Sequence, residues 1–294
     1  MNAALLPPID FSTPVCPELP RKMNAYYGCL CYSGKNAAIR VLHTPLRPDE
    51  IEPSDDKLRE LLSVKSDFRV ASRLLQQGKG RQDSTLLGVA VPKADVDFFL
   101  SMFSVGPPAP ASLEVSGLAV ISAFLHARGA EFQNEVVCLI EAGENISTFA
   151  FLNRDEVFLV GKYNFGLRTL RERLIRDLDV DGELAMTILK DRSINISSSL
   201  TGVQEAFIKQ LSVSKDFVER HENCKITKTY LSGGLSLLSF WPQEIEERLN
   251  TSAQVWSPLE NIQLSSADVM PRELQDQATR FTAAIGAALG GLME

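Results

Sequence analysis

The chain has 294 residues, of which 45% are hydrophobic and 23% are charged, with a net charge of −7 and an isoelectric point near 5.2. This balance is typical of a soluble protein with two domains or one two-lobed domain, and it argues against nucleic-acid binding, which needs a basic surface. No stretch reaches the roughly 18 apolar residues of a transmembrane helix, and the N-terminus lacks the basic region of a secretory signal, so we expect no direct membrane insertion.

The five cysteines and three histidines form no catalytic or metal-binding pattern. Cys29 and Cys31 sit in an apolar, strand-like run, which favours unpaired thiols in a reducing cytoplasm over a disulfide or a metal site. The histidines lie far apart in the sequence, so neither a zinc site nor a Ser-His-Asp triad is indicated.

Residues 1–22 are rich in proline and predict an irregular lead-in to a first unit at residues 23–134. The run AYYGCLCYSGKNAAIRVLHTP predicts two strands in a hairpin, and SDDKLRELLSV predicts a capped helix. Two more strands flank a polar turn at residues 77–83, and KADVDFFLSMF predicts a short helix. The first unit ends with SLEVSGLAVISAFLHARG, a strand leading into a helix that is apolar nearly all round and therefore buried.

The second unit spans residues 135–294 and opens with three predicted strands, Val136–Ile140, Ser147–Leu152 and Glu156–Lys162. Helices are predicted from LRTLRERLIRDL, DGELAMTILKDRS and GVQEAFIKQLSVSKDFVERHENC. The remaining order is strand ITKTYLSGG, helix LSLLSFWPQEIEERLN, strand AQVWSPLE and a final helix, PRELQDQATRFTAAIGAALGGLM. Strands followed by helices, used twice, indicate an α/β protein with two lobes.

The run YLSGGLSLL places Gly233 and Gly234 between a predicted strand and a predicted helix. Two adjacent glycines at such a point expose backbone N–H groups with no side chain in the way, so a flat ring or a phosphate can approach. The alternative is a tight strand-to-helix turn without a ligand, and the residues alone leave both interpretations open.

Three segments in order carry a resemblance: VVCLIEAGENISTFAFL, then YLSGG, then AAIGAALGGL. Their order resembles that of actin-fold nucleotide proteins, and residues 85–294 resemble in detail PilM, the cytoplasmic FtsA-like family of type IV pilus assembly. The resemblance implies an α/β, actin-like (ribonuclease H-like) two-lobed fold with a truncated or degenerate first lobe. The helix that ends the first lobe and the last helix of the chain would be its two connectors.

The resemblance also implies a site for ATP or ADP with Mg²⁺. The segment EAGENIST looks like the second phosphate hairpin, ELAMTILKD like the segment usually written A-E-x-x-K, and YLSGG like the adenosine motif. The implied nucleotide-binding residues are Glu141, Gly143, Ser147, Thr148, Gly166, Lys190, Gly233, Gly234 and Gly286. No catalytic residue and no metal ligand is assigned.

The chain departs from the family pattern on the phosphate side. Glu141 stands where an aspartate is usual, and Phe165 interrupts the glycine pair that ends at Gly166. The first phosphate loop has no Asp-Ile-Gly: either Leu30 and Cys31 replace its residues, or the hairpin is missing outright, which we prefer. Both interpretations remove an acid that helps to hold Mg²⁺, so we expect weak or absent ATP hydrolysis.

Four functions remain after this comparison. The first is a cytoplasmic scaffold or adaptor that reaches the inner membrane only by binding the N-terminal cytoplasmic tail of a PilN-like pilus assembly protein. The second is an actin-fold ATPase, or an ATP-binding protein with weak hydrolysis. A filament subunit of the FtsA type and a sugar kinase, with Asp95 or Asp97 as its base, are weaker alternatives. Whether the chain forms a homodimer stays open.

Overall fold

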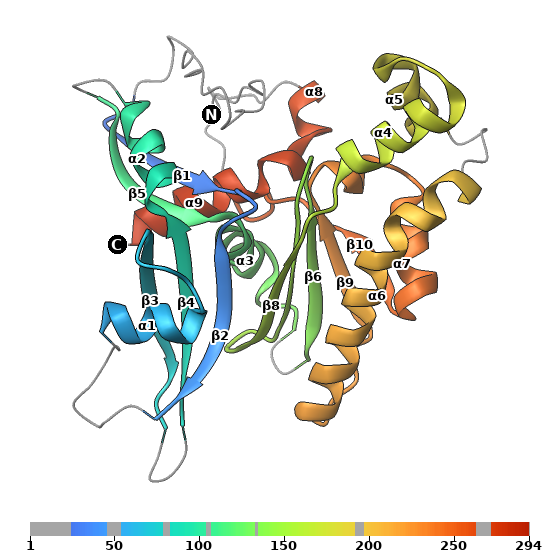
Figure 1. The fold of residues 1–294 in the computed structure, drawn as a ribbon. Helices are drawn as coiled ribbons and strands as arrows, with labels where there is room; N and C mark the ends of the chain where they lie inside the picture. Colours follow the sequence, from blue (N-terminus) through green and yellow to red (C-terminus); the bar gives the residue numbers. More distant parts are fainter. Residues whose placement is uncertain are drawn as a thin grey trace.

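The computed structural model describes residues 25–45, 54–78, 83–103, 107–132, 135–191, 197–262 and 272–293. Within these ranges the chain folds into mixed α/β structure in which two helices, α3 and α9, lie between two groups of strands (Figure 1). The predicted lead-in at residues 1–22 lies outside the described residues.

The first group of strands forms two small sheets. β2 (Ala38–Thr44), β4 (Ser84–Pro92) and β3 (Phe68–Gln76) pair antiparallel in the order β2-β4-β3. β1 (Tyr27–Tyr32) pairs in parallel with β5 (Ala109–Val115). The hairpin predicted for the first two strands is therefore wrong, because β1 and β2 belong to different sheets, whereas the antiparallel β3–β4 pair across the polar turn is confirmed.

Two short helices cover the small sheets at the predicted positions. α1 (Asp55–Leu62) begins at Ser54, whose side chain accepts a hydrogen bond from the Lys57 N–H, and it buries Leu58 and Leu62. α2 (Lys93–Ser101) follows β4 directly. The N-terminal cap and the apolar spacing, both readable in the sequence, explain why α1 forms here.

The second group is one five-stranded sheet in the order β10-β9-β6-β7-β8. β6 (Val137–Ala142), β7 (Ser147–Leu152) and β8 (Val157–Tyr163) pair antiparallel and lie within two residues of the three predicted strands. β9 (Lys228–Ser232) runs parallel to β6, and β10 (Ser252–Val255) parallel to β9.

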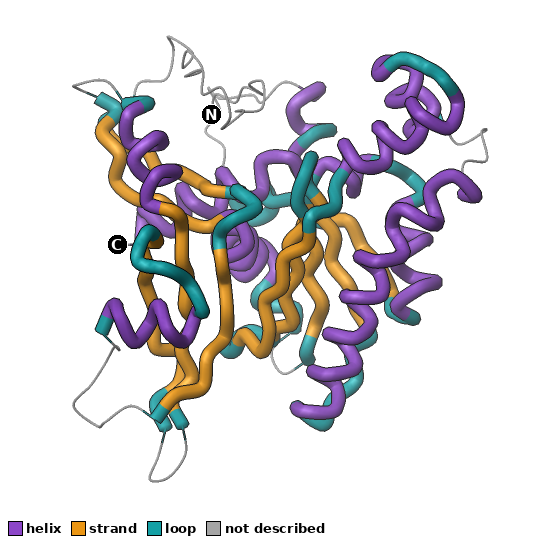
Figure 2. Tube along the Cα trace, in the orientation of Figure 1, coloured by secondary structure: helices purple, strands orange, loops and turns teal. Residues whose placement is uncertain are grey.

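Helices cover both faces of this sheet (Figure 2). α3 (Ser116–Arg128) lies on one face, while α4 (Leu167–Leu178), α5 (Gly182–Lys190), α6 (Ser197–His221) and α7 (Trp241–Leu249) belong to the other side. β7 is buried at every residue, which explains why four apolar residues follow one another from Phe149 to Leu152 without alternating polar ones.

Aromatic rings fill the core on each side of the sheet. On the α6 side, Phe207 stacks on Phe165 with ring centroids 5.0 Å apart and on Trp241 with centroids 6.3 Å apart. On the α3 side, Phe124 packs against Trp256 at 5.1 Å. Both tryptophans are fully buried, as expected for packing residues.

The predicted last helices are interrupted. Strand β9 is followed by a 3-10 turn, η1 (Gly234–Leu237), before α7 begins at Trp241. The final helical run is divided into α8 (Arg272–Gln275), the 3-10 turn η2 (Ala278–Phe281) and α9 (Thr282–Met293). The apolar spacing in both segments predicts helical structure, but it does not reveal these breaks.

α3 and α9 cross at very short range. A Cβ atom at Gly286 of α9 would lie 1.7 Å from the carbonyl oxygen of Ala119 in α3, so only glycine permits this approach. Farther along α9, a Cβ at Gly290 would lie 2.1 Å from Oε1 of Glu114, and one at Gly291 would lie 2.3 Å from Sγ of Cys29. These glycines thus allow α9 to pack closely against α3, β1 and β5 at the same time.

Within the described ranges, no helix is long and apolar enough to cross a bilayer.

The α3–α9 crossing generates a stability prediction. Gly286→Ala is expected to lower the free energy of unfolding by about 3 kcal/mol, because the two helices must move apart to admit the methyl group. Urea unfolding followed by circular dichroism measures this. Gly202→Ala in α6 is the matched control. No atom of the described part of the chain lies within 4 Å of the added Cβ, so this variant should be neutral or more stable by up to about 1 kcal/mol. Equal behaviour of the two variants would contradict the tight crossing.

Candidate functional site

Glu141 and Thr148 face each other across the β6–β7 hairpin. The two residues are register partners, and Oγ1 of Thr148 donates to Oε2 of Glu141 at 3.4 Å. Burial raises the pKa of Glu141 to about 7, and the hydrogen bond from Thr148 lowers it only in part. A carboxyl group that is half protonated at neutral pH is a weaker ligand for Mg²⁺ than a fully ionised aspartate would be.

The turn of this hairpin closes on the start of α4. The carbonyl oxygens of Gly143 and Glu144 accept from the N–H groups of Leu167 at 3.0 Å and Arg168 at 2.9 Å. These are N–H groups that a helix end leaves without an intrahelical partner. A Cβ at Gly166 would lie 2.4 Å from the Glu144 carbonyl oxygen, so this glycine allows the close approach of the turn to the helix.

Ser147 also serves the fold. Its side chain is fully buried, and its Oγ donates to the carbonyl oxygen of Phe165 at 2.8 Å. The Ser147 hydroxyl therefore fixes β7 to the segment before α4. Packing within the fold therefore accounts for Ser147, Gly143 and Gly166, which the sequence resemblance assigned to nucleotide binding.

Gly233 and Gly234 differ in backbone conformation and in the space around the Cβ position. Gly233 has φ +85°, a left-handed conformation, and a Cβ there would lie 2.4 Å from the Ala142 carbonyl oxygen of β6. Its N–H donates to the Thr279 carbonyl oxygen at 3.0 Å, which ties β9 to η2. Among the described residues, the one atom within 4 Å of a Cβ at Gly234 is Cδ2 of Leu167, at 4.0 Å. Gly233 is therefore required by the turn, whereas Gly234 leaves open space beside the start of α4.

Ser232, directly before these glycines, has a polar atom without a partner. It is fully buried, it pairs in register with Glu141, and within the described residues its Oγ has no hydrogen-bond partner. Buried hydroxyls are normally satisfied by protein or by water. This unpartnered hydroxyl is the strongest sign in the structure that a polar atom from outside the described residues belongs near Glu141.

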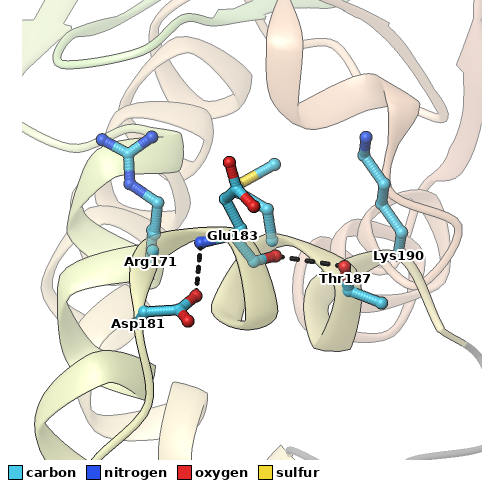
Figure 3. Close-up of a pocket in the computed structure, with 7 residues that line it drawn as sticks. Arg171, Asp181, Glu183, Thr187 and Lys190 are labelled. Atoms are coloured by element: carbon cyan, nitrogen blue, oxygen red, sulfur yellow. Dashed lines mark hydrogen bonds between the residues drawn. The ribbon is translucent and has the colours of Figure 1, made fainter.

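Lys190 lies away from the hairpin, in an open pocket of about 640 Å³ between α4 and α5 (Figure 3). The side chains of Arg171 and Lys190 project to the same side of the two helices (Figure 3). Arg171 forms an ion pair with Glu144 of the hairpin turn, with 3.3 Å between Nη2 and Oε1. Arg171 thus connects this pocket with the β6–β7 turn, although Lys190 itself makes no contact with Glu141. Gly286, by contrast, belongs to the helix crossing.

The sequence did not predict the role of Lys162. This β8 residue pairs with Thr148, and its Nζ donates to the carbonyl oxygens of Gly34 at 3.2 Å, Lys35 at 2.7 Å and Ala37. Burial lowers the pKa of Lys162 to about 8. One ammonium group therefore binds the β1–β2 turn to the five-stranded sheet. Its partners are backbone atoms, so no side-chain motif could have indicated it.

The end of β1 lies close to the same hairpin. Burial, with Glu141 and Glu114 nearby, raises the pKa of the Cys31 thiol. The β1–β2 turn also lies against Lys162, so the segment that follows Leu30 and Cys31 borders the β6–β7 hairpin. Within the described residues, no group of three or more His, Cys, Asp or Glu side chains could hold a metal ion.

The family model described as "Type IV pilus assembly protein PilM" matches residues 116–292, which is more than half of the chain. No curated protein matches this chain. The structure in the "PilM-PilN type IV pilus biogenesis complex" is 18% identical, with a TM-score of 0.79, over 92% of this chain and 81% of that chain.

Two further solved structures are more distant. Ethanolamine utilization protein EutJ from Carboxydothermus hydrogenoformans is 16% identical over 80% of this chain and 70% of its own, with a TM-score of 0.43. The archaeal actin homolog Ta0583 is 15% identical over 64% and 57%, with a TM-score of 0.41. The expected actin-like α/β class is confirmed, and the chain belongs to the PilM family of type IV pilus assembly proteins.

Proposed function

We propose that this PilM-family protein is a cytoplasmic scaffold that binds the N-terminal cytoplasmic tail of a PilN-like inner-membrane protein and reaches the membrane through it. The observation that carries the proposal is the backbone similarity over 92% of the chain to a PilM-PilN complex, together with the family match. The Lys162 contact supports a scaffold, because it holds the two groups of strands together by the chain's own atoms.

The first group of strands offers a docking position for the tail. A recess of about 400 Å³ is lined by residues of α1, β3 and α2, five of them charged and one apolar: Asp55, Arg59, Arg69, Val70, Lys93 and Asp97. Arg69 and Asp97 form an exposed ion pair at 3.6 Å. Exposed side chains of this kind can leave their ion pairs and bind the polar groups of an extended peptide without a change in the backbone. We therefore propose that the tail binds in this recess.

A second candidate function is binding of ATP or ADP with weak hydrolysis. The open space beside Gly234 and the unpartnered Oγ of Ser232 favour it. The phosphate side fits the group less well, because the Ser147 hydroxyl is committed to Phe165 and burial raises the pKa of Glu141 to about 7. A bound nucleotide would then act as a structural ligand, and we assign no hydrolytic step.

The tail proposal predicts a specific effect at Arg69. Wild type should bind a synthetic peptide with the N-terminal cytoplasmic sequence of the PilN-like protein encoded in the same genome, measured by isothermal titration calorimetry. Arg69→Glu should weaken binding about tenfold or more by adding like charge to Asp97. Arg73→Glu, an exposed arginine farther along β3, is the control and should bind like wild type. Binding by wild type but equal affinity of both variants would move the docking site elsewhere.

Cell fractionation tests the scaffold proposal independently. In cells that lack the other pilus assembly proteins, the protein should be found in the soluble fraction. Tight membrane retention in those cells, or no binding of the wild type to the peptide, would contradict recruitment through a partner's tail.

The nucleotide proposal predicts a split between the two glycines. Millimolar Mg-ATP or Mg-ADP should raise the melting temperature of wild type by about 2–4 °C, as expected when the ligand is present near ten times its Kd. Gly234→Val should keep nearly the wild-type melting temperature but lose this gain, because its side chain points into open space.

Gly233→Ala is the companion variant for that measurement. It should lower stability by about 1 kcal/mol or more even without nucleotide, because φ is +85° and the Ala142 carbonyl oxygen is in the way. If wild type gains nothing from either nucleotide, the nucleotide proposal is wrong and the scaffold proposal is unaffected.

Glu141 predicts a pH dependence of stability. Because burial raises its pKa from 4.5 to about 7 in the folded protein, the folded state holds the proton more tightly than the unfolded chain between these values. Stability should therefore fall as pH rises through this window, by up to about 3 kcal/mol. Glu141→Gln should flatten the profile in urea unfolding at pH 5 to 8, and Glu183→Gln, an exposed control, should not. If Glu141→Gln kept the wild-type dependence of stability on pH, the Glu141 carboxyl would not be the group that causes it, and its pKa in the folded protein would not be raised.

A further inference from the structure

α6 presents two large apolar side chains to solvent. It runs along the outer side of the five-stranded sheet (Figure 1), and Phe207, Leu211 and Val218 are buried on its inner side. On the other side Val213 and Phe217 are each 56% exposed, one helical turn apart. An isolated exposed apolar residue is ordinary, but two adjacent ones on a long helix are typical of a contact surface.

Four charged residues flank this apolar pair in a symmetric pattern. Glu205, Lys209, Asp216 and Arg220 are all exposed and follow one another at intervals of four, seven and four residues. At 3.6 residues per turn these intervals keep all four on one flank of the helix. Their signs alternate, so the order acid, base, acid, base becomes base, acid, base, acid when the helix is read backwards.

This pattern is complementary to itself in an antiparallel arrangement. When two copies of α6 lie antiparallel about a two-fold axis between positions 212 and 213, the same flank of each helix meets. Glu205 then faces Arg220 of the second copy, and Lys209 faces Asp216 of the second copy. Each of these contacts occurs twice, because a two-fold interface uses the same patch on both chains.

The same arrangement covers the apolar side chains. Val213 lies next to the axis and meets its own copy, while Phe217 approaches the small side chain of Ala206 on the second copy. Two existing ion pairs position the charges: Arg248 of α7 holds Glu205 with 2.5 Å between Nη2 and Oε2, and Asp216 lies 4.0 Å from Arg220 on the same helix.

We propose that the outer face of α6 is a self-association surface on which a second copy of this chain docks antiparallel, forming a weak two-fold homodimer. One helix pair buries less than the roughly 1,200 Å² of a stable interface, so the dissociation constant should lie in the micromolar range or above. The proposal does not rest on tail binding or on nucleotide binding, because neither the Arg69 recess nor the Gly234 space belongs to this face.

Charge reversal with rescue tests the pairing. Sedimentation equilibrium of the full chain should show concentration-dependent dimers for wild type. Lys209→Glu and Asp216→Lys should each weaken the dimer about tenfold, because each turns two attractive contacts into repulsive ones. Mixing the two variants should restore association, since every contact in the mixed dimer again joins opposite charges.

Controls separate this result from general effects. Phe217→Ala should weaken the dimer, whereas Leu184→Ala, which removes an exposed apolar side chain from α5, should not. Circular dichroism melts should show that each variant is folded. Val213→Cys, next to the axis, should form a covalent dimer with a short bismaleimide reagent above the level seen for wild type with its native cysteines.

Three outcomes would overturn the proposal. The first is wild type that stays monomeric up to about millimolar concentration, well beyond the weak end of specific interfaces. The second is a mixture of the two charge variants that associates no better than either alone, which would exclude the antiparallel pairing. The third is binding of a different pilus protein to the outer face of α6 when the chain shows no self-association through that face.

Discussion

The crossing of α3 and α9 is the constraint on which the rest of the molecule depends. α3 continues directly from β5, and α9 packs on α3, β1 and β5, so the two helices hold both groups of strands. The backbone approach at Ala119 and Gly286 leaves no room for a side chain, which fixes both the distance and the rotation of the helices. The Gly233 N–H donates to the Thr279 carbonyl oxygen in η2, directly before α9, so the end of β9 is also held in place next to the helix crossing.

The glycines that the sequence resemblance assigned to a nucleotide site are present for two different physical reasons. Gly166, Gly233 and Gly286 each admit another segment's backbone at a distance that excludes a Cβ atom. These positions would therefore persist in a chain that had lost its ligand, because losing them costs folding energy. Gly234 has no such packing reason, and Ser232, with its buried Oγ, precedes it by two residues. The case for a ligand thus rests on two residues and not on the whole set.

Local patterns predicted much of this fold. The apolar runs gave β6, β7 and β8 nearly to the residue, and the all-round apolar α3 was correctly placed in the core. Failures came where the partner is distant: β1 pairs with β5, not with the neighbouring β2. The Lys162 contacts join residues more than a hundred positions apart and end on carbonyl groups, which every residue carries. The sequence therefore holds no local signal for the contact that links the strand groups near the site.

The ammonium of Lys162 occupies the kind of oxygen-lined position that a bound cation takes in other proteins. A cation that is covalently part of the chain is present at a fixed stoichiometry and cannot be removed by chelators or diluted away. The contact between the β1–β2 turn and β8 therefore does not depend on the concentration of a free cation.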